Sequence, residues 1–456
     1  GYLEGAQGAA ARGAAVKIVL TTLPDEDQVK DYTTPGFYRN PAVPYMPLGL
    51  LAVAAGIKGH EVKLLDPASF GWGIADTLRE IGAYRPDVLG ISAVTQRAWA
   101  MTELLRQVDV PFKAVGGPHA DLYPDCIPAA VFTGDGDFSF GQWLEKGCPD
   151  GVFNDHIADL DCLPATPWEL LDASVYELKS AGGTLFKRLG MRFNISTSRG
   201  CPYHCTFCGG QDKAFRFKSA RRVVDEMEVA IYQGADWLHV VDDCFNIRRD
   251  RVLAICAEIN RRNLQVEWSA RGRIILDRET AEALAGSGCQ RLHVGVESLD
   301  PAVLRWMNKA QDVETIAAFF SLCREFGIET LAYFMVGSPG EISEYRRHLP
   351  DLIRDLGVTY PYFNILYPLP HTEYYQGLLR DGVFKEDHWA TFARNPQPDF
   401  ELPLPRPLGL QQELEETVAG YIQEFYGRVP QEALSTTVSQ SRQLVPAPPP
   451  GGGARQ

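Results

Sequence analysis

Residues 198–208 read SRGCPYHCTFC and hold three of the ten cysteines of this 456-residue chain. Cys201, Cys205 and Cys208 have the spacing i, i+4, i+7 and follow an apolar run at 191–197 that predicts a strand. A loop with this spacing can wrap three corners of an iron–sulfur cubane. A [4Fe–4S] cluster usually takes four cysteinates, so three would leave one iron open to a small molecule.

A zinc site is the alternative, with His204 or a distant residue as the fourth ligand. A structural zinc site normally shows a second close pair of ligands, and no CxxC or HxxxH pair occurs elsewhere in the chain. The missing second pair weakens the zinc interpretation, but the cysteine spacing alone leaves both kinds of site open.

Strand and helix patterns alternate after the cysteine loop. We expect strands at 191–197, 237–241, 266–270, 290–296, 330–336 and 360–366, with helices at 220–233, 249–260, 277–286, 313–325 and 344–356. Six βα units are too few for an eight-fold barrel, so they predict a partial (β/α)6 barrel over 191–372. A short, mostly helical C-terminal region is expected at 373–429 and a disordered tail at 430–456.

A first alternating series precedes the cysteine loop. Strands are expected at 16–20, 62–65, 87–94, 112–115 and 130–132, and helices at 47–58, 74–83 and 97–108. This pattern predicts an α/β domain at 16–149, built on a doubly wound, Rossmann-like parallel sheet. Ligands bind such sheets at the carboxyl ends of the strands, where this chain has glycine-containing turns. We expect 1–15 to be disordered and 150–190 to be a linker.

The composition limits the class of partner. The chain has 44 Lys and Arg against 58 Asp and Glu, a formal net charge of −14, which argues against a protein that mainly binds nucleic acid. The longest apolar run, 48–57, is about half of the roughly 20 residues that a membrane span needs. The N-terminus lacks the features of a signal peptide. We expect a cytoplasmic protein with reduced thiols and no membrane partner.

The cysteine spacing and the motifs after later strands resemble the radical S-adenosylmethionine (radical SAM) superfamily. The motifs are VDDCF at 241–245, WSARGR at 268–273, VGVES at 294–298 and FMVGSPGE at 334–341. The resemblance implies a [4Fe–4S] cluster on the three cysteines and SAM bound by Phe207, Asp242, Asp243, Arg271, Arg273, Glu297, Ser298 and Gly337. An acid suits the SAM ammonium and an arginine suits its carboxylate, although each of these residues alone could equally be a helix cap or a surface ion pair.

The first domain resembles the cobalamin-binding domain that precedes the radical SAM core in cobalamin-dependent members. The matching segments are 47–50, 59–62, 116–120 and GDGD at 134–137, where the family usually has GEGE. The resemblance implies cobalamin contacts from Ser92, Thr95, Gln96, Gly116, Gly117, His119, Gly134, Asp135 and Gly136. The Asp-x-His-x-x-Gly motif is absent, so a histidine ligand on the lower cobalamin face is not expected. Ordinary βα turns remain the alternative, with the domain binding another partner or none.

The family resemblance implies a methyltransferase that acts on an unactivated carbon, or another non-nucleophilic atom, of a small-molecule or peptide substrate. A cyclase, rearranging enzyme or oxidoreductase without methyl transfer is the main alternative. A methylthiotransferase and a cofactor-based sensor are weaker alternatives. His371 and Tyr203 are the candidate catalytic contacts, although His371 could equally be a surface loop residue. An electron donor of the flavodoxin or ferredoxin type and a monomeric state are also expected.

Overall fold

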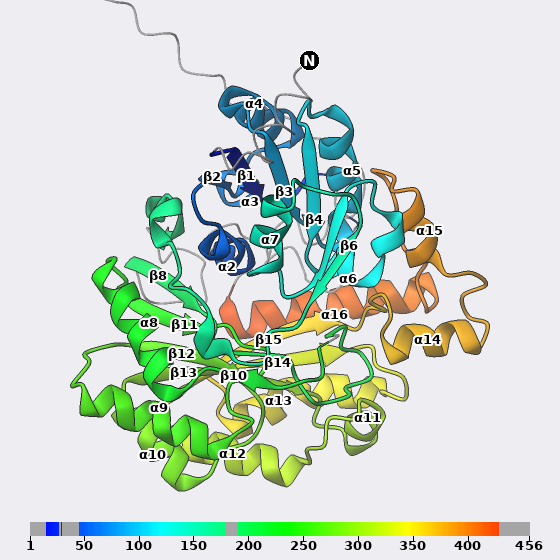
Figure 1. The fold of residues 1–456 in the computed structure, drawn as a ribbon. Coiled ribbons are helices and arrows are strands. Elements are labelled where there is room, and N and C mark those ends of the chain that lie inside the picture. The colour runs from blue at the N-terminus through cyan, green and yellow to red at the C-terminus, as the bar shows by residue number, and fades with distance from the viewer. Residues whose placement is uncertain (1–14, 27–28, 30–44, 179–189, 211, 428–456) are drawn as a thin grey trace, which may run out of the picture.

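The computed structural model describes residues 15–26, 29, 45–178, 190–210 and 212–427. Within them the chain forms a layered α/β domain, a barrel-like sheet with helices on its outer face, and a C-terminal group of helices (Figure 1). The expectations of disorder at 1–15 and 430–456 lie outside the described residues, apart from residue 15.

The N-terminal sheet contains six parallel strands in the order β2-β1-β3-β4-β5-β6. Apolar residues of α2 and α7 cover one face, and those of α4 and α5 cover the other. The doubly wound parallel sheet is thus confirmed. The elements are β1 (Lys17–Thr21), α2 (Leu48–Gly56), β2 (Glu61–Leu65), α3 (Pro67–Phe70), α4 (Ile74–Tyr84), β3 (Val88–Ser92), α5 (Ala98–Gln107), β4 (Phe112–Gly116), α6 (Pro118–Leu122), β5 (Ala130–Gly134), α7 (Ser139–Glu145) and β6 (Val152–Asp155).

Two strands lie in the range predicted as a linker. β6 pairs in parallel with β5 and extends the N-terminal sheet by one strand beyond the expected five. The short β7 (Glu177–Leu178) pairs antiparallel with the first barrel strand. The part of 150–190 that the structure describes is therefore not only a connection, because its ends belong to the two sheets that it joins.

The second sheet has the order β15-β14-β13-β12-β11-β8-β7, and its six longer strands are parallel. Each pair of neighbouring long strands is joined by helical segments on the outer face (Figure 1), as the predicted partial (β/α)6 barrel requires. The elements are β8 (Gly190–Ile195), β9 (Ser198–Arg199), β10 (Arg216–Phe217), α8 (Ala220–Tyr232), β11 (Trp237–Val240), α9 (Arg249–Arg261), β12 (Trp268–Gly272), α10 (Arg278–Gly286), β13 (Cys289–Glu297), α11 (Pro301–Trp306), α12 (Val313–Glu325), β14 (Glu329–Val336), α13 (Ser343–Leu356) and β15 (Tyr360–Ile365).

The alternation of side chains along the barrel strands separates two environments. Phe193, Leu238 and Leu292 belong to the large apolar cluster shared with the outer helices. The intervening positions carry polar residues such as Arg192, His239 and Arg291, which are buried on the other face. Because side chains alternate with period two, these polar residues line the inside of the barrel.

The C-terminal region is helical, as expected, with α14 (Glu373–Arg380), α15 (His388–Arg394) and α16 (Leu408–Tyr426). α16 packs its apolar side chains, including Leu414 and Tyr421, against the last barrel strand. α14 and α15 form a separate apolar cluster with Ala98 and Tyr123 of the first domain. The C-terminal helices therefore contact both the barrel sheet and the first domain. Within the described residues, no helix combines the length and the apolar character needed to cross a bilayer.

Candidate functional site

The cysteine loop begins at a buried anchor. Asp242, only 2% exposed, accepts hydrogen bonds from the Thr197 amide (2.6 Å), the Thr197 hydroxyl (2.5 Å) and the Ser198 hydroxyl (2.6 Å). The Arg251 guanidinium lies 3.8 Å from the same carboxylate. These contacts occupy both oxygens of Asp242, so the carboxylate fixes the path of the chain into the loop. The contact of Asp242 with SAM, expected from the sequence, stays a prediction beside this structural role.

The loop then brings the three thiols to one part of the surface. The Cys201 amide donates to the Asp212 carbonyl (2.9 Å), and the Cys208 amide donates to the Cys205 carbonyl (3.1 Å). None of the three is in a disulfide. No group of three or more His, Cys, Asp or Glu side chains among the described residues is arranged around a single metal ion. A cubane presents its irons at separate corners, so its ligands need not meet at one point.

Two donors point at these sulfurs. Arg273 Nη1 lies 3.5 Å from Cys205 Sγ, and the Gly210 amide lies 3.5 Å from Cys208 Sγ. N–H groups directed at cysteine sulfur stabilise thiolates and are one of the means by which proteins tune iron–sulfur clusters. Three unpaired thiols with donors beside them therefore suit a [4Fe–4S] cluster.

Arg273 also contacts its neighbours on both sides. Its guanidinium stacks on the Tyr203 ring at 3.8 Å, and it donates to the Lys309 carbonyl. Both Tyr203 and Arg273 were predicted from sequence, the first as a catalytic contact and the second as a SAM contact. The structure brings the two together beside Cys205, which places them at the cluster ligand.

Polar residues surround the mouth of the barrel at the carboxyl ends of successive strands. Asp243 reaches solvent at the mouth, and partial desolvation by the surrounding protein, together with the charge of Asp242, raises the pKa of its carboxyl. Arg271 is half-buried, and its Nε atom has no partner among the described residues. Lys309 Nζ lies 3.2 Å from Glu297 Oε1. Glu297 has a positive φ of 66° and lies at a β-bulge of β13. Strained backbone of this kind is enriched at ligand sites.

Three further predicted residues lie around this mouth. Phe207 is half-buried within the cysteine loop. Ser298 is fully buried and lies 3.2 Å from the Tyr345 hydroxyl, so it holds the turn after β13. Gly337 has φ of 81°, and a Cβ there would lie 2.2 Å from Arg406 Nη1. Only glycine admits the Arg406 side chain at this distance.

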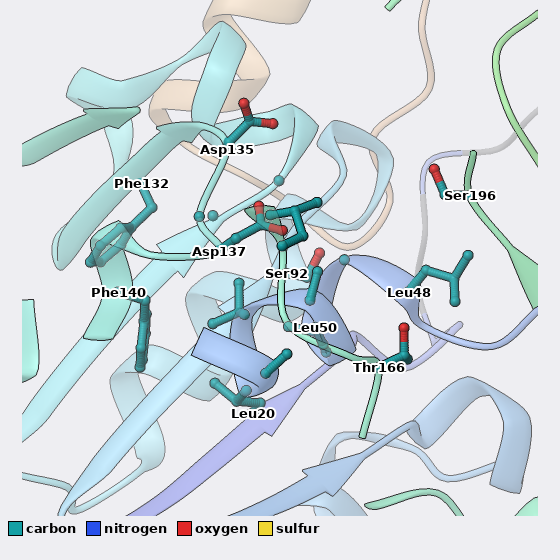
Figure 2. Close-up of a pocket in the computed structure, with 18 of the residues that line it drawn as sticks. Leu20, Leu48, Leu50, Ser92, Phe132, Asp135, Asp137, Phe140, Thr166 and Ser196 are labelled. Carbon is teal, nitrogen blue, oxygen red and sulfur yellow. The ribbon is translucent and has the colours of Figure 1, made fainter. Parts of the chain in front are cut away.

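A cavity of about 330 Å³ opens at the carboxyl edge of the N-terminal sheet (Figure 2). Its lining includes six of the nine residues predicted to contact cobalamin: Ser92, Gly116, Gly117, Gly134, Asp135 and Gly136. Figure 2 shows Ser92, Asp135 and Asp137 on the side of the sheet and Ser196 on the side of the barrel. The cavity thus lies between the two sheets.

Glycines give this cavity its shape. Gly117 has φ of 89° and Gly134 has φ of 71°, and a Cβ on Gly134 would lie 2.3 Å from the Asp155 carbonyl. Apolar side chains, including Leu20, Leu50 and Phe140, form the deeper wall. An apolar cavity edged by backbone amides and a serine suits the nucleotide part of a large cofactor. The residues present therefore fit cobalamin.

The other three predicted contacts lie outside the lining of this cavity. His119 is fully buried, with Nδ1 3.2 Å from Thr95 Oγ1, and burial lowers its pKa to about 4. The Gln96 carbonyl accepts a hydrogen bond from the Val29 amide (2.8 Å). His119 pairs with Thr95 through Nδ1, whereas its Nε2 is buried without a hydrogen-bond partner among the described residues.

His371 is exposed and also has positive φ (59°). Its ring meets the Tyr123 ring edge-on at 5.1 Å, and Tyr123 in turn lies 5.6 Å from His119. The histidine therefore joins the C-terminal region to the first domain. No contact between His371 and the cysteine loop is found among the described residues.

Arg199 connects the cavity to the cysteine loop. Its guanidinium bonds Asp135 (2.6 Å) and both oxygens of Asp137 (2.7 and 2.8 Å). Arg216 bonds Asp135 from the other side and also Asp212 (2.5 Å). Arg199 precedes Cys201 by two residues, so one side chain ties the GDGD segment to the start of the cluster loop.

Sequence reasoning missed the residues that make the longer-range contacts: Arg199, Arg216, Lys309 and Arg406. The signal for Arg199 was its place in SRGC, two residues before Cys201. Asp137 was part of the quoted GDGD motif but was not selected as a site residue.

Comparison with known proteins agrees with this geometry. Residues 195–353 match the family model described as "Radical SAM superfamily". This part of the chain is a radical SAM domain. It contains the cysteine loop and all the barrel strands that carry the predicted SAM contacts.

Relatives of the whole chain extend beyond the radical SAM domain. An uncharacterised methyltransferase of Pyrococcus horikoshii is 25% identical over 415 residues, covering 83% of this chain and 86% of the relative. An anaerobic magnesium-protoporphyrin IX monomethyl ester cyclase of Rubrivivax gelatinosus is 24% identical, covering 66% of this chain and 60% of the relative.

A solved structure shares the two-domain fold. It is the radical S-adenosylmethionine methyltransferase TsrM of Kitasatospora setae with cobalamin and a [4Fe–4S] cluster bound, with a TM-score of 0.60 and 20% identity. The match covers 81% of this chain and 78% of that chain. The arrangement of an N-terminal sheet ahead of a radical SAM domain is therefore an established fold.

Proposed function

We propose that this protein is a cobalamin-dependent radical SAM methyltransferase that methylates an unactivated carbon, or another non-nucleophilic atom, of a small-molecule or peptide substrate. The observation that carries the proposal is the Arg199 bridge. It places the cavity of the N-terminal sheet directly against the loop of Cys201, Cys205 and Cys208. Two cofactor sites that face each other across the barrel mouth suit a substrate held between them.

The bound cofactors supply the difficult chemistry, which is a carbon-centred radical made from SAM at the cluster and a methyl group carried by cobalamin. The protein residues hold and shield them. The three thiolates bind the cluster, with Arg273 beside Cys205. Asp243 is the carboxylate that stays at the mouth while Asp242 is engaged with the loop, and it suits the ammonium of SAM.

The apolar wall of the cavity excludes water from one side of the mouth. Leu48, Leu50 and Phe132 line it together with glycine backbone. His371 and Tyr203 stay candidates for substrate contact, because both belong to loops at the ends of barrel strands.

A cyclase or another cobalamin-dependent reaction without methyl transfer is the second candidate. It is favoured by the magnesium-protoporphyrin cyclase relative, which aligns with two thirds of this chain at the same level of identity as the methyltransferases. The residues described above serve either reaction, because both begin with the same radical.

Product analysis tests both candidates. The chain is reconstituted anaerobically with iron, sulfide and hydroxocobalamin, reduced, and incubated with SAM. A methyltransferase gives S-adenosylhomocysteine together with 5′-deoxyadenosine, whereas the cyclase type gives 5′-deoxyadenosine alone. Cys205→Ala should abolish both products, and Cys162→Ala, which removes an exposed thiol outside the loop, should keep them. If the wild-type chain yields neither product, both candidates are wrong.

The remaining expectations belong to this proposal. A flavodoxin or ferredoxin is the class of electron donor that would reduce the cluster, and the protein would act as a monomer. A cytoplasmic location follows from the need to keep the three cluster thiols reduced.

A further inference from the structure

Three polar side chains, two of them buried and one half-buried, lie just inside the barrel mouth. Asn194, His239 and Arg271 are each the penultimate residue of their strands, β8, β11 and β12. The sheet register pairs His239 with Asn194 on one side and with Ser269 on the other. We call Asn194, His239 and Arg271 the donor layer. Asn194 and His239 lie level in the register, and Arg271 lies two residues nearer the carboxyl end of β12 than Ser269, so the donor layer lies inside the barrel below the loops that follow these strands.

Each residue of the donor layer has a polar nitrogen without a partner. The atoms are Asn194 Nδ2, His239 Nε2 and Arg271 Nε, all buried, and none has a hydrogen-bond partner among the described residues. Asn194 and His239 are each only 1% exposed. A buried donor left unpaired costs about 1–3 kcal/mol. Three such atoms on adjacent strands therefore indicate a site completed by a ligand.

The other polar atoms of these residues are engaged, which fixes their orientation. Asn194 Oδ1 accepts from the Met46 amide (3.2 Å), so its Nδ2 points elsewhere. His239 Nδ1 lies 2.7 Å from Ser269 Oγ, and a serine hydroxyl that donates there leaves the proton on Nε2. Burial, and then the nearby His293 and arginines, lowers the pKa of His239 well below its usual value. The ring is thus neutral, and in the tautomer in which the Ser269 hydroxyl donates to Nδ1 its Nε2 is a hydrogen-bond donor.

The charges around the donor layer are mostly positive. The Arg192 and Arg271 guanidiniums lie 4.9 and 5.1 Å from the centre of the Tyr45 ring, and Arg271 also hydrogen-bonds the phenol. Arg291 belongs to the same barrel face and is paired with Glu329 (2.6 Å). Asp243, at the mouth above, is the carboxylate that acts on Arg271. Tyr45 is 46% exposed, so the two guanidiniums that it covers lie near solvent.

From these contacts we infer that the donor layer binds an oxyanion group of the substrate, a carboxylate or a phosphate. Such a group only accepts hydrogen bonds, and its negative charge complements the guanidiniums of Arg192 and Arg271. Bound there, it would leave the rest of the substrate at the mouth, between the cluster loop and the cavity. The role of the anion as part of a substrate rests on the proposed function, whereas anion binding itself does not.

SAM offers the same chemistry, because it also carries a carboxylate. A substrate anion and the SAM carboxylate can be distinguished by asking whether SAM competes with the added anion. If the donor layer holds the substrate, an anion should bind equally well to chain already saturated with SAM. If it holds the SAM carboxylate, saturation with SAM should displace the anion.

Anion binding can be measured on the full chain reconstituted with cluster and cobalamin. The probes are acetate, followed by saturation-transfer NMR, and inorganic phosphate, followed by ³¹P line broadening, at constant ionic strength in chloride. Acetamide serves as the neutral isostere of acetate. We expect at least one anion to bind with and without SAM, and acetamide to bind at least tenfold more weakly than acetate.

Asn194→Asp tests the donor layer itself. It keeps the size of the side chain and the acceptor for the Met46 amide, but it replaces an unpaired donor with a negative charge. We expect anion binding to weaken at least tenfold. Asn263→Asp, at an exposed turn after α9, adds the same charge elsewhere and should leave binding unchanged. His239→Gln is the second variant should Asn194→Asp fail to fold by circular dichroism.

The inference is overturned if neither anion binds, if SAM displaces the anion, or if Asn194→Asp and His239→Gln bind it as the wild type does. Its failure is distinct from that of the proposed function. A chain that cleaves SAM but does not bind the anion keeps the function and loses this site. A chain that binds the anion and does not cleave SAM keeps the site and loses the function.

Discussion

Replacing Arg199 should uncouple the N-terminal sheet from the cysteine loop at a measurable cost in stability. The guanidinium makes a two-pronged contact with Asp137, at 2.7 and 2.8 Å, and a further bond to Asp135 at 2.6 Å. The side chain of Arg199 is 24% exposed, and those of Asp135 and Asp137 are 8% and 5% exposed. The ion pair is therefore mostly buried, and removal of Arg199 leaves the charge of Asp137 without a partner.

The magnitude follows from that burial. Breaking a buried pair costs about 3–5 kcal/mol, whereas exposed pairs contribute about 0.2–1 kcal/mol. Arg199 is partly exposed, and Asp135 keeps Arg216 when Arg199 is lost. We therefore expect Arg199→Ala to lower the free energy of unfolding by about 2–4 kcal/mol. Most of this loss should arise at Asp137.

A double-mutant cycle isolates the pair. The free energy of unfolding is measured by urea denaturation for the wild type, Arg199→Ala, Asp137→Ala and the double variant, with fluorescence and circular dichroism as parallel probes. Coincident transitions are required before the values are compared, because a two-domain chain can unfold in steps. We expect a coupling energy of about 2 kcal/mol. A coupling below about 0.5 kcal/mol, typical of independent sites, would refute the reasoning.

Arg199→Lys is the matched control. Lysine keeps the charge but cannot make the two parallel bonds to Asp137. It should recover part of the stability and little of the cobalamin retention, because the position of the GDGD segment depends on the bidentate geometry. Equal cobalamin retention by both variants would show that the bridge does not shape the cavity.

Four further predictions follow from individual contacts. Arg273→Gln removes the charged donor at Cys205 and should lower the reduction potential of the cluster, which an EPR-monitored redox titration measures. Tyr203→Leu removes only the stacking partner, and an equal potential in the two variants would contradict the role of Arg273. Gly134→Ala, with its Cβ 2.3 Å from a carbonyl, should reduce cobalamin retained after gel filtration at least tenfold, while Gly147→Ala, a glycine of similar φ in open space, should not. Burial alone would raise the pKa of Asp135, but hydrogen bonds from Arg216, the Ile157 amide and Arg199 bring that pKa below its usual value. The ionised Asp135 therefore stabilises the fold fully above about pH 4, and this stabilisation is lost as the pH falls through the lowered pKa. Arg216→Gln should raise the pH midpoint of acid unfolding, and an unchanged midpoint would contradict this. Gly337→Ala strains a residue with φ of 81° and meets Arg406, and it should cost about 1–2 kcal/mol in urea denaturation, whereas the same cost in an Arg406→Ala background would show that backbone strain accounts for all of it.

Most strands could be predicted from the sequence because each is a short apolar run bounded by turn residues. The predicted strand at 237–241 and the observed Trp237–Val240 differ by one residue. β6 was missed because VFND is short and its side chains are exposed or half-buried, so it has no apolar pattern. It forms only because β5 offers it an edge to pair with, and that edge cannot be seen in the local sequence.

The site divides in the same way. The cysteine spacing and the glycine turns are local features, and the sequence was sufficient to locate them. Asp242 and Asp243 are adjacent and chemically identical, so only the contacts with Thr197 and Ser198 assign the first to the loop anchor and leave the second at the mouth. The Arg199–Asp137 contact joins residues that are 62 positions apart, and no pattern within either segment predicts it.

The Arg199 bridge also bears on how the two cofactor sites keep their separation. Apolar packing tolerates small shifts of one surface over another, whereas a bidentate ion pair is satisfied at one distance and one orientation. Arg199 is separated from Cys201 by a single glycine, so the extended backbone between their Cα atoms can span only about 7 Å. Any displacement of the GDGD segment is therefore transmitted to the first cluster ligand with little slack. A polar contact at this point fixes the distance between cavity and cluster loop more tightly than an apolar contact would, which is what a substrate held between two cofactors requires.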